Sequence, residues 1–391
     1  MNEGNQLNKE NIKFICFFEN PENNTQNRLI SLASINKIKY LNSALIGVNF
    51  TTEIVSLSWT INSKGYYKGK LAKISDGTFL KTFNSFGSKT KVVRIFSYTF
   101  SLLQLFFYLL KNTKRNDKIL VYHSIILSVP IIILKSIKKI KLILEVEEIY
   151  SDVWKERKLF TILEKKLIQS ADSYIFSTHT LVDKINNIKP YIISYGELKH
   201  NKQKVEKYKD KIHLVFAGSF DPIIGVLESI NVAKYLDKTY HLHIIGFGKQ
   251  KETENVLNLI NEVNRNSSCQ VTYDGCLKGD DYIEFIQRCH IGLSTISKRK
   301  GFIDSVFPSK ILSYLCNNLY VVSSDLKSVV ESPFSHLIKF YNEDNPESIA
   351  KAIKEIKIDE NYDKFLEEEI KKIDEKFKKD LLNLINQNDR F

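Results

Sequence analysis

Short apolar runs alternate with helical patterns along the whole chain. Runs such as Lys141–Val146 are apolar almost throughout instead of alternating, which is typical of parallel strands covered on both faces. The predicted strands are Ile12–Phe18, Ala44–Val48, Glu53–Leu57, Ile119–Tyr122, Lys141–Val146, Ser173–Ser177, His213–Ala217, His241–Ile245, Gln270–Tyr273, Ile291–Ser294, Leu319–Val322 and Ile338–Phe340. Helical stretches between them, such as Val226–Tyr235, Glu252–Asn264 and Asp281–Arg288, predict βαβ crossovers. The pattern therefore predicts an α/β architecture that occurs twice.

A polar, charged segment near residue 200 divides the chain. The boundary is expected between Ile193 and Ile212, where YGELKHNKQKVEKYKDK has no strand pattern. This predicts an N-terminal domain over residues 1–200 and a C-terminal domain over residues 201–345. Residues 346–391 are densely charged and predict a helical tail, which we expect to pack across the domains.

The longest apolar stretch is Ile95–Leu110, between Arg94 and Lys111. It is shorter than the ~20 residues that span a bilayer, and Ser, Thr and Gln interrupt it, so we expect a buried or half-buried helix. The N-terminus, MNEGNQLNKEN, has no apolar signal-peptide core. The five cysteines include no C-x-x-C pair, which argues against a disulfide framework or zinc site and favours a cytoplasmic protein.

The net charge of +12 is distributed unevenly. Residues 1–200 carry 29 Lys and Arg against 16 Asp and Glu, whereas residues 201–391 carry 28 against 29. The basic first half predicts an anionic partner, either nucleic acid or an acidic membrane surface. The alternative is a lysine-rich composition without a specific partner.

Three predicted strands of the second half end in small residues. IHLVFAGS ends in Gly218 and Ser219, LHIIGFG ends in Gly246 and Gly248, and VTYDG ends in Gly275. Ligands bind at the carboxyl edge of open α/β sheets, so these ends predict a nucleotide-type site, with simple tight turns as the alternative.

A fourth motif, FPSKILSYL at residues 307–315, predicts a helix start. Pro308 suits the first turn, and Ser309 and Lys310 lie within that turn. Free N–H groups, the helix dipole and the lysine charge together predict an anion site. The basic triplet at residues 298–300 precedes this motif and is either a further diphosphate contact or a solvated loop.

FPSKILSYL followed by LYVVSSD resembles the donor-site signature of family 4 glycosyltransferases of the GT-B fold. VFAGS, LHIIGFG and VTYDGCL resemble further family motifs in the expected order, and NNTQNRLISL, LILEVEEIYSD and ADSYIFSTHTLVDKI resemble bacterial polysaccharide-type members. The resemblance implies two Rossmann-like domains with a cleft between them. The donor-binding residues it predicts, together with the strand ends, are Gly218, Ser219, Gly246, Gly248, Gly275, Cys276, Leu277, Phe307, Pro308, Ser309, Lys310 and Ser313.

Several positions depart from the family pattern. Ser313 replaces the usual donor-contacting Glu, Ser305 beside Asp304 stands at its companion position, and Ile224 replaces a lysine. These departures put the sugar donor and the activity itself in question. The resemblance implies retention of anomeric configuration and no metal, because helix N–H groups and fixed cations stabilise the leaving diphosphate. Asp280 and Asp281 open a helix, so helix capping is favoured over metal binding.

Polar groups also follow the predicted strands of the first half. The catalytic candidates are His123, after ILVY, and Glu147 and Glu148, after LILEV. A hydrogen-bonded structural histidine is the alternative for His123. The candidates for acceptor binding are Asn24, Thr25, Arg28 and Asp152.

The function predicted from the sequence is a retaining hexosyltransferase that moves a sugar from a nucleotide-diphosphate donor to a glycan, lipid-linked or protein-linked hydroxyl. The role expected is bacterial surface-polysaccharide or glycoconjugate synthesis. The alternatives are a non-catalytic partner subunit with a degenerate donor site and a nucleotide-sugar epimerase. We expect no nucleic-acid partner and no cofactor beyond the donor. The expected location is the cytoplasm, with the basic half peripheral on the inner face of the plasma membrane.

Overall fold

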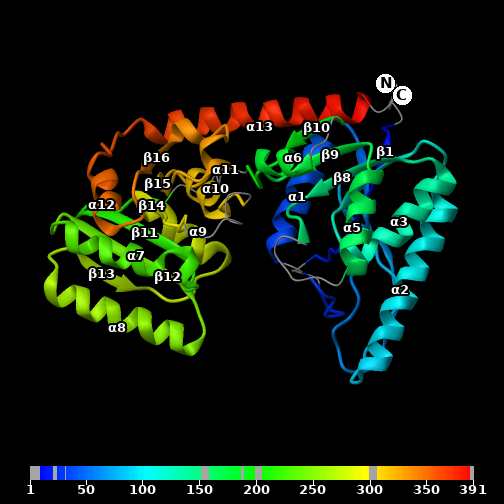
Figure 1. Ribbon diagram of the computed structural model, residues 1–391, viewed down its shortest axis with the longest axis horizontal. Helices are drawn as coiled ribbons and strands as arrows, with labels where there is room; N and C mark the ends of the chain where they lie inside the picture. The colour runs from blue at the N-terminus through cyan, green and yellow to red at the C-terminus, as the bar shows by residue number, and fades with distance from the viewer. Residues whose placement is uncertain are drawn as a thin grey trace, which may run out of the picture. The chain divides into compact units, whose positions relative to one another are not determined.

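A computed structural model of the chain describes residues 9–20, 24–30, 32–150, 158–185, 189–198, 205–298 and 306–387. The chain divides into two compact units (Figure 1). The N-terminal unit comprises residues 1–177, 181–197 and 375–391, and the C-terminal unit comprises residues 178–180 and 198–374. The last helix, α13 (Tyr362–Gln387), is divided between them: its residues from Glu375 onward group with the N-terminal unit.

The N-terminal unit is built on a sheet ordered β10-β9-β8-β7-β1-β2-β5-β4, in which only β4 runs antiparallel to its neighbour. These strands are β1 (Asn11–Cys16), β2 (Thr51–Ser56), β4 (Leu71–Ser75), β5 (Thr78–Lys81), β7 (Lys118–Tyr122), β8 (Lys141–Val146), β9 (Ser173–Phe176) and β10 (Tyr191–Ile193). A small ribbon pairs β3 (Tyr66–Tyr67) with β6 (Ser85–Phe86). The described helices are α1 (Leu32–Gly47), α2 (Lys91–Asn112), α3 (Ile125–Lys138), α5 (Lys158–Ser170) and α6 (His179–Ile185).

One core of this unit lies between the sheet and the helices α2, α3 and α5. Leu105 and Leu109 from α2 and Ile131 and Leu134 from α3 pack there with alternate residues of the strands, such as Val121. Another helix, α1, contacts β2. Its Tyr40 ring stacks on the Phe377 ring of α13 at a centroid distance of 5.4 Å. Helices therefore cover these strands, which is what their continuous apolar runs predicted.

The C-terminal unit has six parallel strands in the order β13-β12-β11-β14-β15-β16. The strands are β11 (Ile212–Ser219), β12 (Tyr240–Phe247), β13 (Gln270–Tyr273), β14 (Ile291–Ser294), β15 (Tyr320–Ser324) and β16 (Ile338–Tyr341). This is the doubly wound 3-2-1-4-5-6 order of Rossmann folds, and its direction reverses between β11 and β14. Ligands bind at the carboxyl ends of the strands at this reversal.

Helices cover both faces of the second sheet. They are α7 (Val226–Asn231), α8 (Gln250–Asn266), α9 (Gly279–Arg288), α10 (Ser309–Leu315), α11 (Lys327–Val330) and α12 (Pro346–Lys354), with 3₁₀ turns at Pro222–Ile224, Val232–Tyr235 and Ser335–Leu337. Leu214, Leu242 and Ile244 join α7, α8 and α12 in the core of one face. Two Rossmann-like sheets thus confirm the predicted fold class.

Two sequence predictions need correction. Ala44–Val48 is not a strand, because its apolar run completes the buried face of α1, where Ala44 and Leu45 are inaccessible to solvent. The helix predicted at residues 95–110 forms as α2 but is mostly exposed: its buried residues are Ser97, Ser101, Leu105 and Leu109. By length and composition α2 is also able to cross a membrane.

Candidate active site

The carboxyl ends of β11 and β12 lie side by side, and their glycines allow the two backbones to approach. Gly218 and Gly246 are partners in the parallel register. A Cβ atom on Gly246 would stand 1.8 Å from the Gly218 carbonyl oxygen, so no other residue fits there. The Gly246 N–H donates to the Gly275 carbonyl at 2.9 Å. The structure therefore brings together the three strand ends that the sequence singled out, and Ser219, Gly248, Cys276 and Leu277 directly follow them.

Helix α10 is fixed beside this edge by Tyr314. Its hydroxyl accepts a hydrogen bond from the Ala217 N–H at 2.9 Å. Its ring covers Gly292 of β14, where a Cβ atom would stand 2.3 Å from the ring. These contacts hold the first turn of α10 next to the end of β11, at the point where the strand order reverses.

The ammonium group of Lys310 is buried at this point and has no hydrogen-bond acceptor within the part of the chain that the structure describes. It lies 3.2 Å from the place that a Cβ atom of Gly218 would occupy and 4.0 Å from the centre of the Phe216 ring. Burial lowers its pKa to about 7. A buried, unpaired cation is costly, and this arrangement is typical of a site that takes an anion.

The remaining predicted donor-site residues have varied surroundings. Pro308 caps the start of α10, Phe307 packs on Phe334, and Ser309 is exposed. The Ser313 hydroxyl forms a 2.9 Å hydrogen bond with Tyr282, so a neutral pair occupies the position where the family pattern has a carboxylate.

The structure describes only part of the basic triplet at residues 298–300 and of the positions that depart from the family pattern. The Lys298 ammonium pairs with Asp325 and donates to the Asn342 carbonyl, which makes it a structural ion pair. Arg299, Lys300, Asp304 and Ser305 lie outside the described residues. Ile224 ends a 3₁₀ turn before Gly225, where a Cβ atom would collide with the Thr295 carbonyl oxygen.

At the carboxyl edge of the N-terminal sheet, Glu147 belongs to a buried ion cluster that the sequence did not predict. Lys37 of α1 lies 2.7 Å from Glu147 and 3.0 Å from Glu145 of β8. Burial raises the pKa of Glu145, and Lys37 opposes this rise. Because Lys37 lies about 110 residues away in the sequence, no spacing pattern links it to the two acids.

His123 and Glu148 lie in the same region. The imidazole of His123 is buried against Tyr150 at a ring distance of 5.0 Å and bonds to the Glu148 backbone. Its Nε2 is 3.6 Å from Glu164, and burial lowers its pKa to about 4, so the ring is neutral near pH 7. Burial also raises the pKa of the half-buried Glu148 carboxyl, with the nearby Glu147 and Glu164 charges adding to the rise.

The predicted acceptor residues form a tight loop before α1. The Asn24 side chain accepts from the Arg28 N–H at 2.7 Å and donates to the Arg28 carbonyl at 2.9 Å. The guanidinium of Arg28 is buried and donates to the carbonyls of Ser58 and Phe83. Arg28 therefore holds the loop, whereas Thr25 is exposed. Asp152 lies outside the described residues.

Comparison with solved structures places this fold in a known class. An E. coli trehalose-6-phosphate structure bound with UDP-2-fluoro glucose superposes with a TM-score of 0.67 at 10% identity, over 97% of this chain and 99% of that chain. A UDP-forming α,α-trehalose-phosphate synthase from Burkholderia xenovorans gives 0.63 at 9% identity, over 97% and 99%. A trehalose-6-phosphate synthase studied for glycosyl transfer with retention gives 0.62 at 10% identity, over 96% and 99%. The class defined by the fold is that of the GT-B glycosyltransferases.

The family comparison points to the same class from the sequence. The model of the family described as glycosyl transferases group 1 matches residues 189–373, which cover the C-terminal unit almost entirely. The C-terminal unit therefore resembles this family in sequence, and the whole chain has the GT-B fold that the motifs indicated. A search of curated protein sequences finds no match.

Proposed function

We propose that this protein transfers a sugar from a nucleotide-diphosphate donor to an acceptor hydroxyl with retention of configuration and without a metal ion. The donor binds at the carboxyl edge of the C-terminal sheet, and the N-terminal unit binds the acceptor. UDP-sugars are the first donors to test, because the E. coli neighbour is bound with UDP-2-fluoro glucose. The acceptor we propose is a glycan or a lipid-linked saccharide of bacterial surface-polysaccharide synthesis.

The observation that carries this proposal is the unpaired ammonium of Lys310 beside Gly218. A diphosphate is the ligand whose charge would complete this site, and the glycines leave room for phosphate oxygens near the backbone. When the glycosidic bond breaks, negative charge grows on the leaving diphosphate. A cation already fixed in a low-dielectric position stabilises that charge without having to reorganise. The seven-residue helix α10 has a weak dipole, so Lys310 supplies most of the stabilisation.

The N-terminal carboxyl edge supplies groups for the acceptor. Glu147 and Glu148 follow β8, and a half-exposed carboxylate there would accept hydrogen bonds from sugar hydroxyls. The neutral His123 positions Glu148 through its backbone. In a retaining transfer the leaving phosphate accepts the acceptor proton, so none of these groups has to act as a strong base.

The test is calorimetric titration of the purified full chain with nucleoside diphosphates and nucleotide sugars in the presence of EDTA. We expect one base to bind selectively, and Lys310→Met to weaken that binding roughly 30- to 100-fold, the loss of a charged hydrogen bond of about 2–3 kcal/mol. Lys298→Met is the matched control, because the Lys298 ammonium already has Asp325 as its partner. Equal affinities for the two variants would contradict the role of Lys310.

Turnover separates the proposal from its two alternatives. Sugar transfer to a saccharide acceptor supports the transferase, whereas interconversion of the nucleotide sugar without an acceptor identifies an epimerase. The absence of binding across the whole panel would point to a partner subunit whose donor site has degenerated, with Ser313 and Ile224 as its signature.

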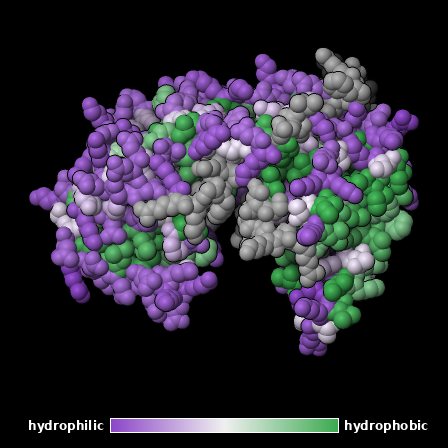
Figure 2. Space-filling model, in the orientation of Figure 1, coloured by the Kyte–Doolittle hydropathy of each residue, from purple (hydrophilic) through white to green (hydrophobic). Residues whose placement is uncertain are grey.

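We further propose that the N-terminal unit docks on an anionic membrane. Helix α2 buries two serines and two leucines and turns other large apolar residues outward. Its residues Val92, Ile95, Phe96, Leu103 and Phe107 are 50–77% exposed. The neighbouring α3 adds Ile126, Val129, Ile133 and Ile137. Figure 2 shows hydrophobic surface over these two helices.

Basic residues accompany this apolar surface. Lys91 and Arg94 at the start of α2 and Lys111, Lys114 and Arg115 at its end are exposed. A lipid surface fits this combination, because apolar side chains enter the interface while each nearby cation gains about 1 kcal/mol from anionic headgroups. A lipid-linked acceptor would be reached from such a position.

Vesicle sedimentation tests this docking. We expect the chain to sediment with vesicles that contain phosphatidylserine, and Phe96→Ser/Phe107→Ser to reduce binding severalfold. Phe365→Ser on α13 is the control, since Phe365 is a similarly exposed phenylalanine outside this surface. Failure to bind anionic vesicles at low salt would contradict the membrane proposal and leave the donor site untouched.

A further inference from the structure

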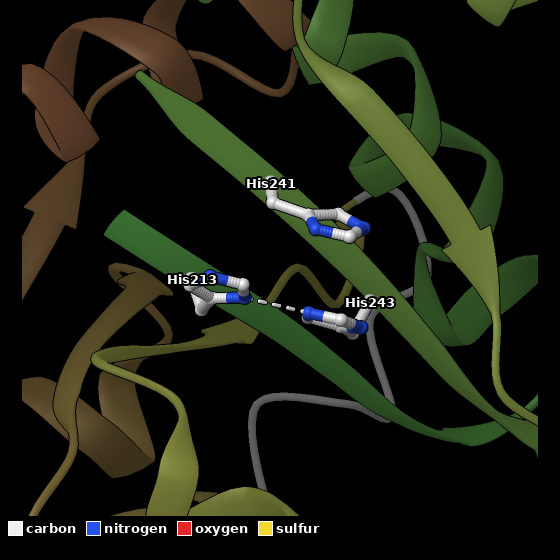
Figure 3. A group of neighbouring side chains, drawn as sticks. All are labelled: His213, His241 and His243. Atoms are coloured by element: carbon white, nitrogen blue, oxygen red, sulfur yellow. Dashed lines mark hydrogen bonds between the residues drawn. The ribbon is translucent and has the colours of Figure 1, made fainter. Parts of the chain in front are cut away.

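Three histidines gather at the amino-terminal end of the C-terminal sheet, at the edge opposite to the glycines (Figure 3). His213 belongs to β11, and His241 and His243 belong to β12. His213 and His241 are register partners, and His243 lies two residues further along, so all three side chains leave the same face of the sheet. One ligand nitrogen from each lies within 4.8 Å of the others.

Each of these imidazoles has one nitrogen held by an oxygen atom at the outside of the group. His213 Nε2 is 3.0 Å from Asp210, His243 Nδ1 is 3.0 Å from Asp274, and His241 Nε2 is 3.2 Å from the Thr272 hydroxyl. A carboxylate on the outer nitrogen fixes the tautomer so that the inner nitrogen carries a lone pair. Histidine ligands of metals usually donate their other ring N–H to a carboxylate or another oxygen atom in this way.

The inner nitrogens face each other. His213 Nδ1 and His243 Nε2 are 2.8 Å apart, as the dashed line in Figure 3 marks. When both outer nitrogens carry the protons that their carboxylates accept, the two inner nitrogens present lone pairs to each other, and a cation between them would relieve this contact.

We propose that His213, His241 and His243 bind a divalent transition metal ion, for which Zn²⁺ is the natural probe. Imidazole nitrogens suit zinc, copper, nickel and cobalt, whereas magnesium and calcium prefer oxygen ligands. Zinc–nitrogen bonds of about 2.0–2.1 Å in a tetrahedron separate the ligands by roughly 3.3 Å. The closest pair therefore has to open by about half an ångström, which small ring rotations provide.

The surroundings suit a structural metal. Asp210 and Asp274 offset the ion's charge, and the Tyr208 ring stacks on His213 at 4.1 Å and shields it. An open cavity of about 660 Å³ lies beside Asp210 and is lined also by Tyr208 and His290, while the three histidines do not line it. The ion would join β11 to β12 at the end remote from the proposed donor site. The site is thus independent of the proposed function.

The test is titration of the EDTA-treated full chain with Zn²⁺ and Co²⁺, in a Cys276→Ser background that removes the exposed thiol. We expect one ion per chain, the intense visible absorption of tetracoordinate Co²⁺, and a higher unfolding temperature with the metal. His243→Gln should weaken binding at least 100-fold, and Asp274→Asn about 10- to 100-fold. His336→Gln should leave it unchanged, because His336 is exposed and pairs with Glu369.

His241→Gln provides a second measurement if His243→Gln fails to fold, because His241 is only partly buried. Binding that is equal in His241→Gln and His336→Gln, or that has no fixed stoichiometry, would overturn the proposal and leave a hydrogen-bonded imidazole pair. Nucleotide binding by these variants should equal that of the Cys276→Ser protein with its histidines intact, so failure of this site is distinguishable from failure of the donor site.

Discussion

Each of the two sheets has a buried lysine ammonium at its carboxyl edge. In the C-terminal sheet the ammonium of Lys310 has no hydrogen-bond acceptor among the described residues. In the N-terminal sheet the ammonium of Lys37 forms ion pairs with two carboxylates. The two lysines have similar burial but opposite energetic roles. Lys37 is satisfied by its own chain and holds the edge together. The charged form of Lys310 costs free energy in the unliganded protein, and a bound anion would offset that cost.

The contrast also shows in the backbone of the two edges. Glycines line the C-terminal edge, so phosphate oxygens are able to approach main-chain N–H groups near Gly218 and Gly246. Acidic side chains and the neutral His123 line the N-terminal edge, where hydroxyl groups find acceptors. The difference therefore favours an anionic donor on one unit and a hydroxylated acceptor on the other.

The largest effect is expected at Lys37. Lys37→Met leaves Glu145 buried without its cation, so the free energy of unfolding at pH 7 should fall by about 3–5 kcal/mol. Urea denaturation followed by circular dichroism measures this loss. The double variant Lys37→Met/Glu145→Gln should recover a large part of it, because no uncompensated charge remains in the interior. A loss below about 1 kcal/mol would mean that Glu145 takes up a proton when Lys37 is removed or that water reaches the cluster.

The pH dependence of stability should distinguish Lys310 from Lys37. The unfolded chain holds a proton on Lys310 up to the ordinary lysine pKa of 10.5, but the folded chain releases it near pH 7. Unfolding takes up a proton between these values, so the free energy of unfolding rises with pH by as much as about 1.4 kcal/mol per unit. Below pH 7 the destabilisation is complete and the slope vanishes.

Comparison with Lys310→Met isolates this contribution. The variant should be more stable than the parent protein at pH 6, and the difference in the free energy of unfolding should narrow as the pH rises from 7 and disappear near pH 10.5. A saturating diphosphate should abolish the slope, since the bound anion raises the pKa of Lys310. A parent protein and a variant with parallel stability curves would show that the ammonium is solvated.

The sequence indicated the elements of the C-terminal candidate site more completely than the contacts at the N-terminal edge, for a physical reason. Each glycine strand end and the Phe307–Lys310 motif is recognisable from a few adjacent residues, and the parallel sheet then brings these segments together. The Lys37–Glu145 pair arises only when α1 packs beside β8, and nothing near either residue indicates it. His241 and His243 share a readable H-x-H pattern, but the register that adds His213 comes from strand pairing.

A smaller effect is expected from two glycine substitutions that sharpen the backbone contrast. Gly246→Ala places a methyl group against the Gly218 carbonyl and should cost about 1–3 kcal/mol while weakening nucleotide binding. The methyl group of Gly275→Ala meets no atom within 4 Å. The only expected cost is that of placing alanine at a positive φ of 85°, which is about 1–2 kcal/mol. Thermal unfolding and nucleotide titration of both variants separate the two cases. Unaltered nucleotide affinity in Gly246→Ala would contradict the close backbone approach.

The smallest perturbation uses the protein's own thiols. Cys276 is exposed beside Gly275, whereas the other four cysteines are buried, and burial raises the pKa of Cys269 to about 12. Iodoacetamide should therefore alkylate Cys276 selectively, and the nucleotide selected by titration should slow that reaction severalfold by covering the strand ends. Mass spectrometry of the intact chain measures the rate, and Lys310→Met provides the comparison, because protection should then require more nucleotide. If the nucleotide binds but does not slow alkylation of Cys276, the base lies away from Gly275 and Cys276. The donor site would then be confined to the ends of β11 and β12 and the first turn of α10.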